Sequence, residues 1–119
     1  MMGLKLSLWV DILRGKSYYH KKQGLGKCFT LDSVGGYYND LISKTQWSGP
    51  VDRDGIPQNI LSNGERVYFP TTITQMALGF YDKWIIHREG EYLDSFLRLA
   101  RWLRKNQDQE GGWDTWSKF

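Results

Sequence analysis

The stretch "NQDQEGGW", Asn106 to Trp113, follows a helical pattern and decides which fold the rest of the chain fits. Its paired glycines, Gly111 and Gly112, can adopt the left-handed conformation that ends a helix. Gln107 is placed to hydrogen-bond backbone groups that the helix end leaves free, and Trp113 can fold its indole back over that end and shield those bonds from water. Such a turn fastens the end of one helix to the start of the next, so it predicts an array of helical hairpins.

Upstream of this turn the sequence predicts two helices. The first begins at Pro70, where proline fixes φ and a threonine just after it caps free amides, and it runs to about Ile86. The second runs from Glu91 to Gln107, and the short connection "HREGE" makes the two helices antiparallel. Apolar residues recur at helical spacing in both: Ile73, Met76, Ala77, Phe80, Tyr81 and Trp84 in the first, and Tyr92, Phe96, Leu99, Ala100 and Leu103 in the second.

A basic row lies opposite the apolar face of the second helix, formed by Arg98, Arg101 and Lys105. We interpret this row as a solvated helix face. The formal net charge is +3, which suits an acidic partner, but no nucleic-acid reader motif is present, so nucleic acid is not expected as a partner.

The sequence divides into residues 1–66, an N-terminal helix plus a glycine-rich irregular segment, and residues 67–119, which carry the helical hairpin. The N-terminal helix is predicted over Leu4 to Arg14, and Gly15 ends it. The run "CFTLDSV", residues 28–34, is a plausible strand. The run "YYNDLISK", residues 37–44, predicts either one helical turn or a short strand.

Turn chemistry predicts one β-hairpin within the irregular segment. Strands around Ile60 and Val67 are joined through Asn63-Gly64, a pair that accepts the positive φ of a tight turn. Asp52 and Asp54 resemble the spacing of a calcium loop, but the remaining ligands are missing, so this stretch predicts a turn and no metal site.

Aromatic residues make up 15% of the chain, which indicates either a packed aromatic core or a groove of rings for ring-shaped ligands, and we favour the core. The single cysteine, Cys28, excludes an internal disulfide and an all-cysteine metal site, and no cofactor is expected. The sequence contains no recognisable signal peptide or membrane-spanning run, so we expect a soluble chain without a membrane partner, and nothing indicates its compartment.

The turn resembles the Q-x-x-x-G-x-W turn of α/α-toroid proteins, a fold shared by triterpene cyclases and many polysaccharide-active enzymes. A wider stretch, "VYFPTTITQMALGFYDKW" followed by "ARWLRKNQDQEGGW", resembles the C-terminal domain of the D-glucuronyl C5-epimerases. "GGYYNDLISK" is similar to the segment that precedes the family's helical domain, and together the similar segments cover about two-thirds of the chain. The matching residues are Phe69, Pro70, Ile73, Gln75 and Leu78 in the first helix, and Trp102, Leu103, Asn106, Gln107, Gly111, Gly112 and Trp113 in the second.

This resemblance implies a mainly α fold, an incomplete α/α-toroid. It also implies an isomerase that inverts carbon 5 of glucuronate in heparan-type or related polysaccharides. Such an enzyme must neutralise the sugar carboxylate and place a base and an acid on opposite faces of the ring. The family's catalytic tyrosines and glutamate lie in hairpins beyond the "GGW" turn, and the sequence ends at Phe119, so no catalytic residue is assigned. We therefore expect a fragment or a truncated homologue, or a chain that assembles with other copies of itself.

Five residues are candidates for binding an acidic, glucuronate-containing polysaccharide: Tyr37, Tyr38 and Tyr68, whose rings could stack on sugars, Arg53, which could meet a carboxylate, and Gln75. Each has a structural alternative. Tyr37 and Tyr38 could be aromatic packing, Arg53 could be a solvated turn residue, and Gln75 could be a helix cap. Two other functions stay open, a non-catalytic module that binds acidic glycans or serves assembly, and a terpene-cyclase-like or glycoside-cleaving toroid fragment. The absence of an Asp-rich motif and of a convincing carboxylate pair argues against the latter.

Overall fold

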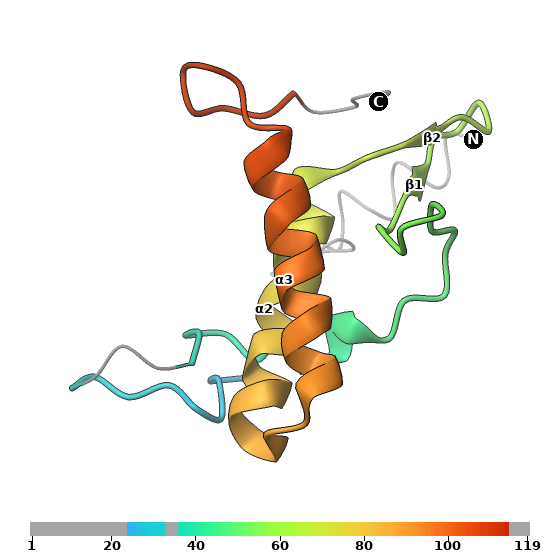
Figure 1. Cartoon of the computed structure of the whole chain (residues 1–119). Coiled ribbons are helices and arrows are strands. Elements are labelled where there is room, and N and C mark those ends of the chain that lie inside the picture. Colours follow the sequence, from blue (N-terminus) through green and yellow to red (C-terminus); the bar gives the residue numbers. More distant parts are fainter. Residues whose placement is uncertain (1–23, 33–35, 115–119) are drawn as a thin grey trace, which may run out of the picture.

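The computed structural model describes residues 24–32 and 36–114, and this part of the chain is mainly helical. Two helices, α2 (Pro70–His87) and α3 (Gly90–Lys105), follow a short 3₁₀ helix, η1 (Ile42–Thr45), and a two-stranded antiparallel sheet (Figure 1). The strands are β1 (Asn59–Ile60) and β2 (Arg66–Val67). The helix predicted over Leu4 to Arg14 lies outside the described residues.

Helices α2 and α3 pack along each other as an antiparallel pair, as their sequence pattern predicts (Figure 1). The connection is shorter than the predicted five residues, because α3 already begins at Gly90 and leaves only Arg88 and Glu89 between the helices. Arg88 makes the reversal in the left-handed region, with φ 54°, and its guanidinium lies 4.5 Å from the centre of the Trp84 ring. This cation–π contact helps to hold a conformation that is unfavourable for a non-glycine residue.

The core lies between these two helices and the loops that precede them. Ile73 of α2 and Leu99 of α3 are completely buried, and Ile56 and Tyr68 extend the cluster into the chain before α2. Much of the aromatic content packs around this cluster, as predicted. The other buried members are Met76 and Ala77, and the partly buried hydrophobic neighbours are Trp47, Phe80, Phe96, Trp102 and Leu103.

Helix η1 rests on the middle of α2. It forms the predicted helical turn at the end of the "YYNDLISK" run, while Asn39 earlier in the run makes an isolated bridge with Leu25. The contact depends on Gly79, where a Cβ atom would meet the Leu41 carbonyl oxygen and would lie 2.9 Å from Cγ2 of Thr45. Leu41 itself is buried. The glycine therefore lets the main chain before η1 approach the helix closely.

The predicted β-hairpin is confirmed. Asn59 pairs with Val67 and Ile60 with Arg66, and the connecting turn has Gly64 at φ 85°. The Asn63 side chain accepts a 3.0 Å hydrogen bond from the Glu65 amide. The Asn-Gly pair thus supplies both the side-chain acceptor and the positive φ that the turn requires.

The strand predicted for residues 28–34 is wrong over residues 28–32, and residues 33–35 lie outside the described ranges. A turn interrupts this stretch, since the Phe29 amide donates to the Gly26 carbonyl at 3.2 Å. Pairing occurs earlier in the chain, as a single antiparallel bridge between Leu25 and Asn39. The Phe29 ring instead makes an edge contact with Tyr38, with 5.1 Å between ring centres.

The predicted threonine cap at the start of α2 is also wrong. Pro70 occupies the first helical position, so the N-cap is Phe69, and among the described residues no side chain caps this end. Thr71 and Thr72 are the second and third residues of the helix. Their hydroxyls therefore do not occupy the N-cap position.

The residue that ends α3 is not the one predicted. The helix ends at Lys105, and Asn106, with φ −99°, forms the C-cap, so Gly111 and Gly112 do not end the helix. The Asn106 side-chain amide donates to the Trp102 carbonyl at 2.9 Å. Gln107 bonds the Gly111 carbonyl at 2.8 Å instead of the helix, because the left-handed Gly111, with φ 87°, folds the following turn back towards it.

The prediction that Trp113 folds its indole back over the end of α3 is confirmed, but the bond that it makes there is exposed, so the predicted shielding from water is not borne out. Its indole Nε1–H donates a 2.7 Å hydrogen bond to the Leu103 carbonyl, one of the last carbonyls of α3. Asp108 supports this return, because its Oδ1 accepts the amides of Glu110 and Gly112 at 2.9 and 2.7 Å. The indole therefore satisfies a helix-end acceptor that otherwise has no intrahelical partner.

We expect Trp113→Phe to lower the free energy of unfolding by about 1 kcal/mol, because phenylalanine keeps a ring but loses the donor to Leu103. Urea unfolding measures the change. Backbone amides in the last turn of α3 should also exchange faster with solvent. A variant as stable as the wild type, with unchanged exchange in that turn, would contradict this role.

Candidate functional site

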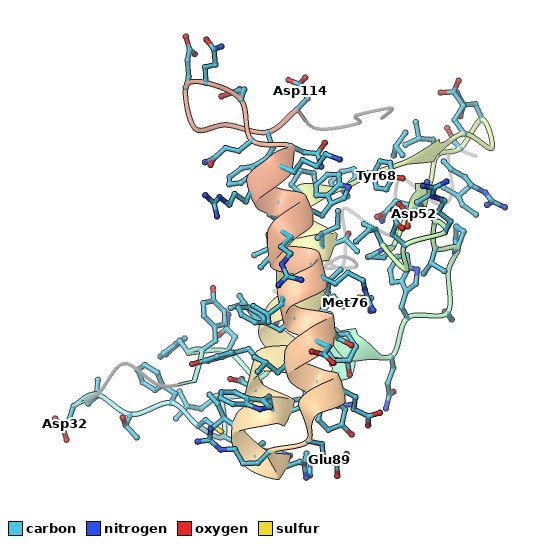
Figure 2. The ribbon with its side chains drawn as sticks, viewed as in Figure 1. Asp32, Asp52, Tyr68, Met76, Glu89 and Asp114 are labelled. Carbon is cyan, nitrogen blue, oxygen red and sulfur yellow. The ribbon has the colours of Figure 1, made fainter. Side chains whose placement is uncertain are left out.

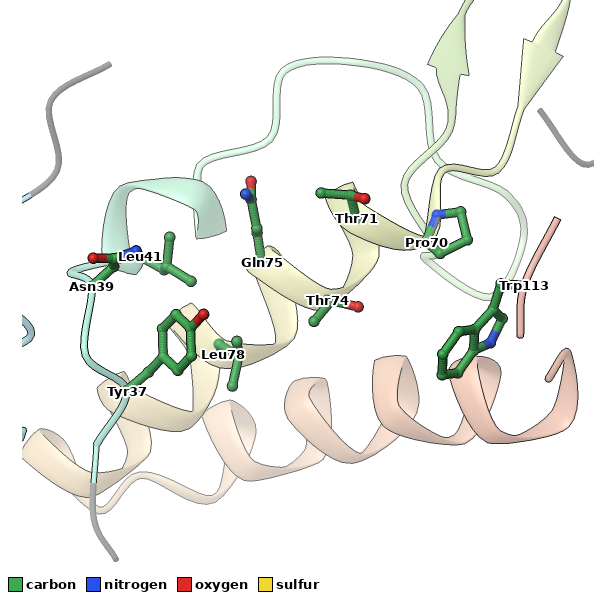
Figure 3. A pocket seen from close by; sticks show the side chains of 9 residues that line it. All are labelled: Tyr37, Asn39, Leu41, Pro70, Thr71, Thr74, Gln75, Leu78 and Trp113. Carbon is green, nitrogen blue, oxygen red and sulfur yellow. The ribbon is translucent and has the colours of Figure 1, made fainter. Parts of the chain in front are cut away.

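A groove of about 330 Å³ runs along the side of α2, with the main chain of residues 37–41 at one end and Trp113 at the other (Figure 3). Its volume lies at the lower end of the range of small-ligand sites. The lining residues are Tyr37, Asn39, Leu41, Pro70, Thr71, Thr74, Gln75, Leu78 and Trp113.

Helix α2 provides the floor of this groove. Thr71, Thr74, Gln75 and Leu78 recur at spacings of three and four residues, so they share one face of the helix. The core residues of α2 lie on a different face, which packs against α3. One helix thus presents an apolar face to the core and a mixed hydroxyl, amide and apolar face to the groove.

Two partly exposed aromatic rings mark the ends of the groove. Tyr37 is 42% exposed and Trp113 is 39% exposed, and Figure 3 shows them at opposite ends of the α2 segment that carries Gln75. The amide of Asn39 also lines the groove. Rings that offer flat apolar faces, together with lining amides that can both donate and accept hydrogen bonds, suit a ligand that is itself a ring with polar substituents.

Both aromatic ends are attached to the scaffold. Trp113 is held by its bond to Leu103, and the Tyr37 amide donates to Oδ1 of Asp82 at 3.4 Å. The main chain beside Tyr37 is held further by Gly26, whose amide donates to the Tyr38 carbonyl at 2.8 Å. Bonds outside the groove therefore hold the Trp113 indole itself and the main chain that carries Tyr37.

Of the five residues predicted from sequence, the structure brings Tyr37 and Gln75 together in the groove and leaves the other three outside it. Tyr38, next to Tyr37, is 60% exposed and contacts Phe29, and Arg53 is exposed in a turn. Tyr68 is buried, with its ring 5.1 Å from that of Trp102, so its expected position on an open loop is corrected to the core.

The Tyr68 hydroxyl completes a turn built around Asp52 (Figure 2). It donates to Oδ2 of Asp52 at 2.7 Å, while Oδ1 accepts the amides of Asp54 and Ile56 at 2.8 and 3.0 Å. Burial alone would raise the pKa of Asp52, but the bonds from the Ile56 amide and the Tyr68 hydroxyl lower it overall. Burial and the bond to this carboxylate raise the pKa of Tyr68.

The predicted turn is present: Gly55 reverses the chain with φ 79°, and Asp52 is the acceptor that closes the turn. Within residues 24–32 and 36–114 there is no group of three or more His, Cys, Asp or Glu side chains that could hold a metal ion.

Of the nine residues that line the groove, the sequence predicted only Tyr37 and Gln75 as binding residues. The recurrence of Thr71, Thr74, Gln75 and Leu78 at helical spacing was a usable signal, since it describes a second face of α2 beside the apolar one. Trp113 was identified for its role at the helix end but not as a wall of the groove. Asn39 and Leu41 carry no local pattern that would place them there.

Neither helix in the described part of the chain has the length and apolarity needed to cross a membrane. Comparisons of the sequence and the structure with protein-family models, with curated proteins and with solved structures found no match.

Proposed function

We propose that this chain belongs to a D-glucuronyl C5-epimerase-like protein of uronate-containing polysaccharide, and that its groove binds the glycan. The observation that carries the proposal is the groove itself, with Tyr37 and Trp113 at its ends, the Gln75 amide between them and the Asn39 amide at the Tyr37 end. Sugar rings have apolar faces that stack on aromatic side chains and hydroxyls that pair with amides, so this lining suits a short stretch of glycan.

The start of α2 supports an acidic ligand in particular. Pro70 and Thr71 line the groove, and no side chain of the described residues caps this helix end. The first amides of an α-helix have no intrahelical acceptor and carry the positive end of the helix dipole. Pro70 has no N–H, and the Ile73 amide donates to the Phe69 carbonyl. The amides of Thr71 and Thr72 are therefore the ones that would stabilise a uronate carboxylate at this end of the groove.

The groove supports binding more directly than it supports a complete proton-transfer reaction. Tyr37 is the one titratable side chain among the described residues that line it. Inversion at carbon 5 needs a base on one face of the sugar ring and an acid on the other. This observation favours the second candidate function, a non-catalytic module that binds acidic glycan, for the described part of the chain.

We expect Tyr37→Ala to weaken the binding of a glucuronate-containing oligosaccharide about tenfold, a loss of about 1.4 kcal/mol, because it removes one stacking wall. Gln75→Ala should weaken binding in the same direction by removing the central amide. Isothermal titration calorimetry measures both changes. Tyr38→Ala is the matched control, since this neighbouring tyrosine lies outside the groove and should leave the affinity unchanged. Equal affinities for wild type and Tyr37→Ala would overturn the assignment of the groove.

Catalysis is tested separately, by incubating the full-length protein with a glucuronate polymer in deuterium oxide. Incorporation of deuterium at carbon 5 supports the epimerase reaction. Saturable binding without incorporation supports the binding module instead. If the polymer neither binds nor exchanges, both functions are excluded.

A further inference from the structure

Asp82 is a buried carboxyl group in the middle of α2, with 1% of its surface exposed. Its Oδ1 accepts the Tyr37 amide, and its Oδ2 is buried and has no hydrogen-bond partner among residues 24–32 and 36–114. A buried ionised carboxylate with an unpaired oxygen is costly, and buried charges are normally paired. This cost favours the neutral acid.

The chain that covers Asp82 leads directly to the groove. A Cβ atom on Gly36 would lie 3.0 Å from Oδ1 of Asp82 and 2.5 Å from Cβ of Cys28, so this segment is closely packed over the carboxyl. Tyr37 follows immediately, and its ring forms one end of the groove (Figure 3). The bond to Asp82 is therefore a direct connection between a titratable group and a wall of the groove.

We propose that Asp82 is a pH-responsive latch, which holds Gly36 and Tyr37 against α2 while its carboxyl carries a proton and releases them when the carboxyl ionises. Release lets water reach the carboxylate, and it moves the Tyr37 wall away from Gln75. Asp82 acts on the groove through Tyr37 and is thus a positioning residue. The consequence for glycan binding rests on the proposed function, whereas the latch itself does not depend on any ligand.

The charged surroundings of Asp82 agree with this direction. Burial raises the pKa of Asp82, the Tyr37 amide lowers it, and the negative charge of Asp40 raises it. The Cys28 thiol faces the same region, where burial and the charge of Asp82 raise its pKa while Arg88 and Lys27 lower it. The strongest effect on Asp82 is burial, which disappears when the segment opens, so the proton is held more tightly in the closed state.

The sign of the pH dependence follows from this difference. In the open state the Asp82 pKa is close to the ordinary value of about 3.9, and in the closed state it is higher. The closed-to-open ratio is therefore largest below the ordinary pKa, falls as the pH rises from that value to the closed-state pKa, and is constant above it. Each unit of difference between the two pKa values lowers the ratio about tenfold.

The test is hydrogen exchange of the Tyr37 amide in the protein without ligand, followed by NMR and corrected for the intrinsic pH dependence of exchange. We expect its protection to be highest at acidic pH and to fall as the pH rises towards neutral. Asp82→Asn keeps an oxygen acceptor for Tyr37 but cannot ionise, so its protection should not change with pH. Asp94→Asn, at an exposed aspartate of α3, is the control and should behave as the wild type.

A direct titration of the Asp82 carboxyl carbon by NMR needs no substitution, and it tests the latch even if a variant fails to fold. A midpoint above the ordinary range supports the latch, and Asp40→Asn should lower that midpoint. An ordinary midpoint, or the same pH dependence of Tyr37 protection in wild type and Asp82→Asn, would overturn it. Absence of glycan binding in a chain whose Tyr37 protection still follows Asp82 would exclude the proposed function and leave the latch intact.

Discussion

Leu99→Ala is expected to lower the free energy of unfolding by about 3 kcal/mol, the largest effect of any change considered for this protein. Leu99 is completely buried where α3 meets α2, so removing its branched end leaves a cavity between the helices. Urea unfolding followed by helical circular dichroism measures the loss. Leu31→Ala is the chemically matched control, since Leu31 is 91% exposed and should change stability by less than about 0.5 kcal/mol. Equal effects of the two substitutions would show that α3 does not pack on α2 through Leu99.

Gly79→Ala is expected to lower the free energy of unfolding by about 2 kcal/mol, although alanine is the better helix former by about 1 kcal/mol. Two effects compete at this position. The added methyl group would strike the Leu41 main-chain carbonyl, and neither that carbonyl nor the neighbouring Thr45 can move aside freely. Overpacking against fixed backbone therefore outweighs the gain in helix propensity.

Gly90→Ala separates these two effects. Gly90 begins α3, and a Cβ atom there would meet nothing within 4 Å, so alanine should leave stability unchanged or raise it slightly. The same urea titrations serve for both variants. If Gly79→Ala were as stable as Gly90→Ala, the close approach of η1 to α2 would be wrong.

The two helices and the β-hairpin were predictable because local signals in those regions agree with one another. Apolar residues recur at helical spacing around Ile73 and Leu99, and both prove to be completely buried. In the hairpin turn, Asn63 supplies the side-chain acceptor and the neighbouring Gly64 supplies the positive φ. In such segments the local preference and the tertiary packing favour the same structure.

The errors arose where several local options compete and the rest of the fold selects one. Either a threonine or the residue before Pro70 could begin α2, and proline at the first helical position selects Phe69. Either the paired glycines or an amide could close α3, and Asn106 does so because its side chain reaches the Trp102 carbonyl. The predicted strand after Cys28 is replaced by a turn that brings Phe29 against Tyr38.

The groove could be predicted only in part, because its walls come from three separate places in the chain. Gln75 was identified through a family resemblance and Tyr37 as an aromatic residue in a glycine-rich loop, and both line the groove. Trp113 follows the end of α3, and the turn around Asp108 together with the bond to Leu103 brings it back to the groove. No local pattern in the sequence specifies such a return.

The most direct test of the central claim is to map by NMR where a glucuronate-containing oligosaccharide binds to the isotopically labelled chain. The groove predicts saturable shifts of Tyr37, of the Gln75 side-chain amide and of the Trp113 indole N–H, all fitted by one dissociation constant. The exposed basic face of α3, at Arg98, Arg101 and Lys105, should stay unperturbed. Shifts confined to that basic face, with the groove unchanged, would contradict the account.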